Sequence, residues 1–261
     1  HELVAIEQDS RAVQAQFHNG RSISSDWLLG ADGIRSVARR ALFGPDEPTF
    51  TGYVAFRGLV DATELPAEYL DPPLAMTIGP GRLLMRYPLR RGQLLNIVAI
   101  ARRAAWTEEG WSVATPVSEL AAEFADFDPQ SRAILSRIPA DGCFKWGLFD
   151  RDPMPTWTCG RATLAGDAAH AMPPFTGQGA VMALEDGVVL GRAASAAQDI
   201  ADCLRRYEQA RHARTVRALE MSRARAHLYF DDDPGEQVRA LGAGMRELRS
   251  LYDYDAGRVP V

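Results

Sequence analysis

The sequence predicts an α/β fold that is interrupted by an antiparallel β-sheet and followed by helices. A buried strand that runs into a turn and a helix occurs twice, over about residues 27–42 and again from residue 162 onward. Between the two occurrences, residues 53–101 alternate strand-like runs with turn clusters. One α/β domain with an inserted sheet explains this order, because two independent domains would be expected to give a cleaner split.

The composition is that of an ordinary folded protein. Of the 261 residues, 46% are hydrophobic, which is enough for a sizeable core. The net charge of −5 gives no reason to expect nucleic acid as a partner, and no apolar run reaches the ~18 residues of a membrane helix. Three cysteines without a C-x-x-C motif predict reduced thiols, no metal site and a cytoplasmic location. Lys145 is the only lysine among 29 basic residues, a codon bias that indicates a bacterial source.

The first elements predict a hairpin that leads into a buried strand. Apolar runs at residues 3–7 and 12–17 are separated by Gln8-Asp9-Ser10, which predicts strand, turn and strand. The run Trp27-Leu28-Leu29-Gly30 predicts a buried strand, followed by a helix over about residues 34–42. A domain rarely begins with such a strand unless another strand lies beside it. We therefore expect a βαβ unit upstream and interpret the chain as a fragment.

The later elements are predicted from alternation, amphipathic spacing and flanking turn residues. Strands are expected at Tyr53–Val60, Leu74–Ile78, Leu83–Pro88, Leu94–Ala101, Cys143–Phe149 and Ala162–Ala165. Helices are expected at Val117–Ala125, Pro129–Arg137, Gly179–Ala196, Ile200–Tyr229 and Pro234–Leu251. Acidic and apolar residues are interleaved with the arginines of Arg205–Arg225, so we interpret this stretch as a solvated helix face.

The first candidate site is the turn after the first buried strand, Gly30-Ala31-Asp32-Gly33-Ile34-Arg35-Ser36. A carboxylate projects there, Gly33 permits a close approach, and the following helix N-terminus offers N–H groups to phosphate or ribose oxygens. The residues alone leave an alternative open, in which Asp32 only caps the helix and Gly33 only forms the turn.

The second candidate site is longer, with Gly166-Asp167-Ala168-Ala169-His170 followed by Pro174 and then Gly177-Gln178-Gly179. A carboxylate at the carboxyl end of a strand lies where open α/β sheets bind ligands, and it accepts hydrogen bonds from hydroxyl groups. The two later glycines allow a close backbone approach. The helix that follows directs its positive end at an anion bound on the loop.

The two stretches resemble the second and third flavin fingerprints of the class A flavoprotein monooxygenases, which include p-hydroxybenzoate and salicylate hydroxylases. Tyr53–Gly58 resembles the strand that opens their substrate domain, and Lys145–Pro155 resembles the salicylate hydroxylase branch. The resemblance covers about residues 1–230 and implies a Rossmann-like, GR2-type FAD-binding domain interrupted by an antiparallel β-sheet substrate domain, with C-terminal helices. The family's first fingerprint, G-x-G-x-x-G, is missing from this sequence.

By this resemblance the chain divides into four segments. Residues 1–50 and 151–198 would form parts of the FAD-binding domain, residues 51–150 the substrate domain, and residues 199–261 the C-terminal helices.

The resemblance also implies roles for individual residues. Asp167 would bind the ribityl chain of the flavin, and Pro174 would lie over the ring where oxygen adds. His170 would orient the loop, and Arg35 would contact a phosphate of the nicotinamide cofactor unless it is simply a surface arginine. The cofactor-binding residues expected are Asp32, Gly33, Arg35, Gly166, Asp167, Gly177, Gln178, Gly179 and Ala180.

The implied reaction is hydroxylation of a small salicylate- or hydroxybenzoate-like substrate by dioxygen. NADH or NADPH would reduce FAD, and a flavin C4a-hydroperoxide would attack the ring. Arg57 would pair with a substrate carboxylate, or else form a structural ion pair, and Tyr87 would roof the pocket, or else belong to the core. The protein is expected to be a monomer or a homodimer.

Four alternatives stay open or are weakened. Another flavin enzyme, such as an epoxidase, would share these fingerprints. A halogenase is disfavoured because the G-W-x-W-x-I-P stretch is missing. The chain could also be an inactive fragment or a binding module, whereas an NAD dehydrogenase would need a glycine-rich fingerprint of its own.

Overall fold

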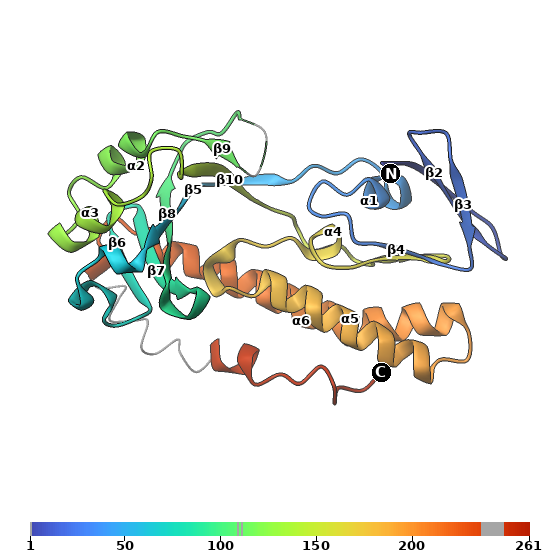
Figure 1. Cartoon of the computed structure of the whole chain (residues 1–261). Coiled ribbons are helices and arrows are strands. Elements are labelled where there is room, and N and C mark those ends of the chain that lie inside the picture. The colour runs from blue at the N-terminus through green and yellow to red at the C-terminus, as the bar shows by residue number, and fades with distance from the viewer. Residues whose placement is uncertain (1, 109, 111, 236–247) are drawn as a thin grey trace. The chain divides into compact units, whose positions relative to one another are not determined.

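The chain forms two units, and the sequence of one is inserted into the sequence of the other. The computed structural model describes residues 2–108, 110, 112–235 and 248–261 (Figure 1). Among them, residues 2–49, 149–225 and 248–261 form the first unit, and residues 50–148 and 226–235 form the second. The interruption that the sequence predicted is therefore present. The finer division into four segments stays a prediction.

The first unit begins with a three-stranded antiparallel sheet. Its strands are β1 (Leu3–Gln8), β2 (Val13–Phe17) and β3 (Ser22–Ser25). The turn between β1 and β2 forms because the Asp9 carboxylate accepts the N–H groups of Arg11 and Ala12, at 2.7 and 2.9 Å. The hairpin is the one that the sequence predicted. β3 was not predicted, because its four residues are exposed and only Ile23 among them is apolar.

A second small sheet holds both strands that the sequence predicted before the candidate turns. The prediction that residues 27–30 form a buried strand is wrong, because Trp27 and Leu29 are 37% and 38% exposed. Its strand order is β11 (Thr158–Cys159), β12 (Ala162–Leu164) and β4 (Leu28–Gly30). β12 and β4 run parallel, with Leu164 opposite Gly30. All three residues of β12 are buried, as expected for a strand covered on both faces. The parallel pairing brings the carboxyl ends of both strands to one edge of the sheet.

The described part of this unit also contains the helices α1 (Val37–Phe43), α4 (Asp167–His170), α5 (Gly179–Ala196) and α6 (Ile200–Tyr229), and the short 3₁₀ turn η4 (Pro174–Thr176) precedes α5. Residues 248–252 are helical as well. The last four residues of α6 belong to the second unit. α5 and α6 have the predicted bounds, whereas the one-turn α4 was not predicted. The predicted helix Pro234–Leu251 lies largely outside the described residues.

The core of the first unit lies among β12, α4, α5 and the first half of α6. It consists of small and medium apolar side chains around two large aromatic ones, Trp157 and Tyr207. The other buried members are Ala38, Met154, Leu164, Ala165, Ala168, Ala169, Val189, Leu190, Ala193, Cys203 and Leu204.

The second unit is a six-stranded sheet with helices α2 (Val117–Glu123) and α3 (Pro129–Leu135) packed on one face. The strand order is β6 (Ala75–Gly79), β7 (Arg82–Leu89), β8 (Leu94–Arg102), β5 (Thr49–Asp61), β10 (Phe144–Asp150) and β9 (Val113–Ala114). Short 3₁₀ turns occur at Ala62–Glu64, Ala67–Leu70 and Arg90–Gly92. The predicted strands and helices of this region are present, and their ends differ by a few residues at most.

The core of the second unit is apolar, because alternate residues of the central strands face the two helices. The sheet and the helices contribute Val54, Phe56, Val60, Leu65, Leu84, Leu95, Ile97, Ala99, Leu120, Phe124, Phe127, Ile134, Leu135, Ile138 and Cys143.

Three further features bear on function. All three cysteines, Cys143, Cys159 and Cys203, are free thiols. Within the described residues no helix combines the length and the apolarity needed to cross a membrane. The same part of the chain holds no group of three or more His, Cys, Asp or Glu side chains that is arranged to bind a metal ion.

Candidate functional site

The two candidate turns lie together at the carboxyl edge of the β12–β4 pair. Gly30 and Leu164 end their strands opposite each other, and the Ala165 N–H donates to the Gly30 carbonyl at 2.9 Å. The turn that carries Asp32 and the turn that carries Asp167 therefore leave the sheet side by side. In open α/β sheets, ligands bind at this edge.

The Asp32 carboxylate caps helix α1. Its Oδ2 accepts the N–H groups of Val37 and Ala38 at 2.8 and 3.0 Å, and its Oδ1 accepts the Ser36 hydroxyl. The Ser36 Oγ in turn accepts the Arg39 N–H at 2.8 Å. Because these two side chains cap the helix, α1 begins at Val37. The sequence had predicted a start near residue 34. The capping alternative thus describes what this carboxylate does in the structure.

The neighbouring glycines serve two different purposes. At Gly30 an added Cβ would lie 2.7 Å from both the Ala38 Cβ and the Leu164 Cδ2, so this glycine lets α1 approach the strands closely. Gly33 has a φ of +79°, and nothing lies within 4 Å of the position of a Cβ there. Arg35 is exposed. The surface around Gly33 is therefore open to a ligand.

Asp167 is the exposed carboxylate of the second turn. Gly166 before it has φ 58° and ψ −143°, a conformation that is essentially restricted to glycine. The turn directs the chain into α4, and the Asp167 side chain makes no hydrogen bond within the described part of the chain. Its oxygen lone pairs are available to hydroxyl groups of a ligand.

The loop from Pro174 to the start of α5 offers backbone and helix-end groups. Pro174 and Gly177 are exposed, and Gly177 has a left-handed φ of 67° with open space where a Cβ would lie. α5 begins at Gly179, so the N–H groups of its first turn have no acceptor within the helix. Ala180 is exposed in that turn, whereas Gln178 is almost fully buried. Such a helix end favours an anionic or electron-rich ligand.

Two buried polar atoms beside this loop have no hydrogen-bond partner among the described residues. They are the Thr176 Oγ1 and the Gln178 Oε1. Buried polar atoms are rarely left unpaired in native proteins, so such atoms point to contacts that a bound group completes. With the open space at Gly177, these atoms fit a cofactor that is bound against the loop.

Two buried arginines hold the turns to each other. Arg39 of α1 donates from Nη1 to the carbonyls of Ala168 and Ala169, both at 3.2 Å. Arg151 donates from Nε to the Ile34 carbonyl at 2.8 Å, and both arginines form ion pairs with Asp46. These contacts tie α1 to α4 through the backbone. Nothing in the sequence pattern distinguished Arg39 or Arg151 from surface arginines.

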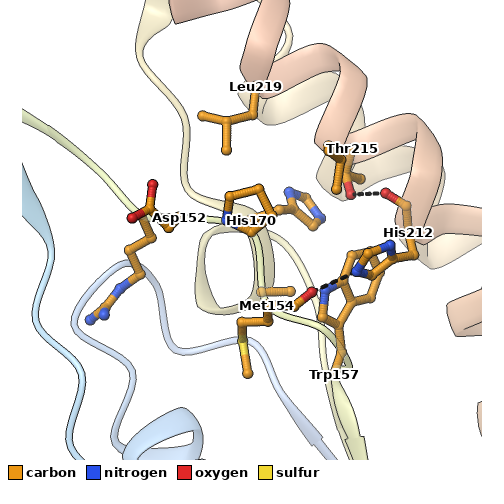
Figure 2. Close-up of a pocket in the computed structure, with 11 residues that line it drawn as sticks. Asp152, Met154, Trp157, His170, His212, Thr215 and Leu219 are labelled. Atoms are coloured by element: carbon orange, nitrogen blue, oxygen red, sulfur yellow. Dashed lines mark hydrogen bonds between the residues drawn. The ribbon is translucent and has the colours of Figure 1, made fainter.

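A small pocket adjoins α4 and shows how His170 is held (Figure 2). The Trp157 ring lies 5.3 Å from the His170 ring and 5.5 Å from the His212 ring, measured between centroids. His212 donates from Nε2 to the Met154 carbonyl at 2.6 Å. These aromatic contacts pack His170 beneath the turn. They agree with the structural role expected for His170.

The arginine-rich stretch of α6 is not a solvated face throughout. Arg211 is completely buried, because α6 directs it toward the adjacent carboxylates Glu185 and Asp186 of α5. The interpretation of residues 205–225 as a solvated face is therefore wrong for Arg211 and for the buried Arg225. Two adjacent acidic residues, Glu185 and Asp186, within a run of apolar and small residues of α5 were the signal that could have predicted a buried cation.

Arg57 and Tyr87 lie in the second unit. They project from β5 and β7 on the sheet face opposite the α2–α3 core. Asn96 of the intervening strand β8 is opposite Tyr87, whereas Arg57 is opposite Val98, two residues further along β8. The exposed Arg57 donates from Nε to the Asn96 Oδ1 at 3.1 Å, while Tyr87 is half-buried. The Asn96 Nδ2 is buried without a partner among the described residues. The sequence analysis missed Asn96, although an amide inside the apolar run of β8 was a visible signal.

Comparison with known proteins decides the family. A family described as an FAD-binding domain matches residues 1–222 of this chain. The chain is 38% identical over 252 residues to 3-amino-4-hydroxybenzoate 2-monooxygenase PtnB3 of Streptomyces platensis. The matched residues cover 96% of this chain and 62% of that protein. It is 37% identical to 3-hydroxybenzoate 6-hydroxylase 2 of Aquipseudomonas alcaligenes, over 95% of the chain and 77% of that protein.

The chain belongs to the class A flavoprotein monooxygenases. The structure is also similar to a solved salicylate hydroxylase–substrate complex, with a TM-score of 0.86, 27% identity, and coverage of 98% of this chain and 68% of that one. FAD is the cofactor of this family's domain. The chain spans 62% of the length of PtnB3. The resemblance drawn from the two fingerprints, and the fold class it implied, are confirmed.

Proposed function

We propose that a protein of the relatives' full length containing this chain is an FAD- and NAD(P)H-dependent monooxygenase that hydroxylates a small aromatic acid. The observation that carries this proposal is the exposed Asp167 at the end of β12, with the open N-terminus of α5 following in the same unit. The relatives named above support the reaction class, because their names describe hydroxylation of hydroxybenzoates. A cytoplasmic location and a monomeric or homodimeric state remain predictions.

In this proposal the first unit holds the flavin through groups at one sheet edge. Asp167 accepts hydrogen bonds from the ribityl hydroxyls. The N–H groups at Gly179 and Ala180, with the backbone at Gly177 and Gln178, face the electron-rich edge of the ring and stabilise negative charge on it. When bound, the flavin would accept two electrons from NAD(P)H and activate dioxygen.

The other predicted residues keep narrower roles. Pro174 covers the flavin ring and helps to exclude water from it. Gly33 leaves room for the cofactor, and Gly166 sets the turn that aims Asp167. Asp32 contributes mainly by fixing α1, and Arg35 offers an exposed cation to a nicotinamide-cofactor phosphate.

The second unit supplies the substrate contacts in this proposal. The Arg57 guanidinium is held by the Asn96 amide oxygen and leaves its terminal N–H groups for a substrate carboxylate. Tyr87 lies on the same sheet face and offers a phenolic hydroxyl. A hydroxybenzoate presents both a carboxylate and a phenol, which suits this pair of side chains.

The test is an FAD titration combined with substrate-stimulated oxidation of NAD(P)H. Asp167→Ala removes a charged acceptor and is expected to weaken FAD binding by about ten-fold or more. Glu220→Ala removes another exposed carboxylate from the same unit and should leave FAD binding unchanged. Hydroxybenzoates are expected to stimulate NAD(P)H oxidation.

Two results would count against the proposal. If the Asp167→Ala variant binds FAD as strongly as the unmodified protein, Asp167 is not a flavin contact. A protein that binds FAD but oxidises no NAD(P)H with any hydroxybenzoate would leave another flavin enzyme, or an inactive binding module, as the function.

A further inference from the structure

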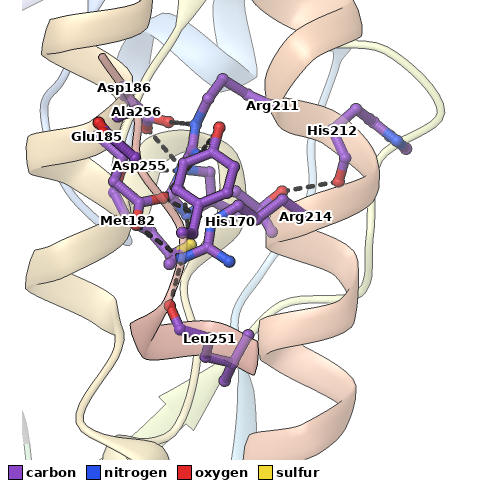
Figure 3. Close-up of polar contacts among 12 residues, drawn as sticks. His170, Met182, Glu185, Asp186, Arg211, His212, Arg214, Leu251, Asp255 and Ala256 are labelled. Carbon is purple, nitrogen blue, oxygen red and sulfur yellow. Dashed lines mark hydrogen bonds and ion pairs between the residues drawn. The ribbon is translucent and has the colours of Figure 1, made fainter. Parts of the chain in front are cut away.

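Asp186 is a buried carboxylate that contacts three separate parts of the first unit. It lies on α5 and is 0% exposed. Its Oδ2 accepts the Gly166 N–H at 2.9 Å and the His170 Nε2–H at 2.7 Å, while its Oδ1 accepts the Arg211 Nε–H at 2.8 Å. Figure 3 shows Asp186 and Arg211 facing each other from α5 and α6, with His170 alongside. One carboxylate therefore joins α5, α6 and the fingerprint turn.

The carboxylate is ionised in this setting. Burial opposes its ionisation, but the hydrogen bond from His170 and the charge of Arg211 hold the pKa of Asp186 below its ordinary value. Because an ionised carboxylate only accepts hydrogen bonds, the His170 Nε2 carries a proton. The His170 Nδ1 has no partner among the described residues, so the bond to Asp186 is the polar contact that orients this ring.

The contacts of Asp186 lie at both ends of α4. Gly166 is the residue before α4, and no side chain caps the N-terminus of that helix. His170 is its last residue and donates its backbone N–H to the Gly166 carbonyl at 2.9 Å. The single turn that carries Asp167 is therefore held at its start and at its end by one oxygen of Asp186.

We propose that Asp186 is a positioning residue for the flavin, because it holds the Gly166–His170 turn in the orientation that presents Asp167. This inference rests on the proposed function, in which Asp167 binds the cofactor. Asp186 itself is buried and acts through the turn. Arg211 serves the same purpose from the other side, since it fixes the second oxygen of the carboxylate.

Glu185 provides a matched control, because it belongs to the same ionic cluster without touching the turn. Its carboxylate accepts from Arg211 Nη1 at 2.6 Å, and from Arg214 Nε and Nη2 at 2.7 Å each. Within the described residues it makes no hydrogen bond or ion pair with Gly166 or His170. If the cluster only clamps α5 to α6, Glu185 and Asp186 should matter in the same way.

The experiment compares Asp186→Asn with Glu185→Gln by amide hydrogen exchange and by FAD titration. Both substitutions remove one carboxylate charge and keep the side-chain shape. We expect Asp186→Asn to speed exchange of the Gly166 amide by about ten-fold or more. We also expect it to weaken FAD binding by about ten-fold, whereas Glu185→Gln lowers the melting temperature and changes neither readout.

A measurement on the unmodified protein keeps the proposal testable if Asp186→Asn does not fold. The Gly166 amide should be strongly protected from exchange, and ¹⁵N NMR should show His170 protonated at Nε2. An unprotected Gly166 amide, or a His170 protonated only at Nδ1, would overturn the proposal.

The failure of this inference differs from the failure of the proposed function. If the unmodified protein does not bind FAD, the proposed function fails, and the positioning role fails with it. If FAD is bound and the two variants weaken it equally, the cluster is a helix clamp, and only the positioning role is wrong.

Discussion

The interiors of the two units differ in what they bury. The first unit buries charged side chains, among them Arg39, Arg151, Asp186 and Arg211. The second unit buries mainly apolar side chains such as Phe124, which is completely buried against Phe127 in an edge-to-face contact, although Arg86 is a buried cation there. Burying charges contributes little net stability, whereas burying apolar area is the main source of it. The comparison indicates that the buried charges of the first unit position groups, whereas the apolar cores of both units supply stability.

The partners of the buried charges support this conclusion. Arg39 and Arg151 donate to backbone carbonyls next to the candidate site, and Asp186 accepts a backbone N–H there. Such bonds specify where a loop lies, because each donor has a direction. A core of apolar side chains imposes no comparable direction on a loop.

The largest effect is expected in the core of the second unit. Phe124→Ala removes a fully buried aromatic side chain and should lower the free energy of unfolding by about 3–5 kcal/mol. Urea denaturation measures this loss. Leu74→Ala, at a side chain that is 62% exposed, is the control and should stay within about 0.5 kcal/mol of the unmodified chain. Equal effects of the two substitutions would contradict the role assigned to this core.

Breaking the buried ionic cluster of the first unit should come next. Arg211→Met leaves Asp186 and Glu185 without their buried cation and is expected to cost about 3 kcal/mol. Arg205→Met breaks an exposed pair with Asp202 on the same helix and should cost at most about 1 kcal/mol. If thermal denaturation gives the two variants the same stability, the cluster does not organise this interior.

A matched glycine substitution in each unit sharpens the comparison. An added Cβ would lie 2.7 Å from its nearest neighbour both at Gly30 and at Gly58. At Gly58 the neighbours are side-chain atoms of Ile138, whereas at Gly30 they include the Ala38 Cβ, which can move only with the backbone of α1. Each Gly→Ala change should cost about 1–3 kcal/mol, with Gly30→Ala the larger.

The glycine pair also separates positioning from stability. Gly30→Ala pushes α1 away from the candidate site and should weaken FAD binding, whereas Gly58→Ala should leave it unchanged. An FAD titration of both variants checks this prediction. A loss of affinity in Gly58→Ala alone would reverse the assignment of the two units.

The smallest effect concerns the thiols. Burial, aided by the charge of Glu119, raises the pKa of Cys143 to about 11, and burial also raises the pKa of Cys203. At pH 8 a thiol reagent should therefore modify the partly exposed Cys159 first, and mass spectrometry of the labelled peptides identifies the site. Early labelling of Cys143 would contradict the packing of the second core.

The raised pKa of Cys143 predicts that the stability of the folded chain decreases at alkaline pH. The folded chain favours the neutral thiol of Cys143, so this contribution to stability is complete below about pH 9. It is lost as the pH rises toward about 11, because only the unfolded chain ionises readily in that window. A Cys143→Ala variant should lack this part of the alkaline loss in denaturation curves.

The local pattern of apolar, glycine and turn residues was sufficient to predict most of the helices and strands of this protein. The bounds of α5 and α6, the strands before both turns, and the strands of the inserted sheet followed from apolar periodicity and turn residues, although β4, unlike β12, is not buried. The fingerprints around Gly30 and Gly166 also identified the family, because glycine and aspartate at such spacings reflect local backbone demands.

The tertiary structure alone decided which polar residues are buried and what they contact. Asp32 was ambiguous in sequence, and its bonds to Val37 and Ala38 show a helix cap. Arg211 was expected on a solvated face, yet it is buried against α5. The physical reason is that a buried charge needs partners, and here those partners come from elements distant in the chain. Periodicity describes one element at a time, so only the packing of α5 and α6 could show where Asp186 and Arg211 meet.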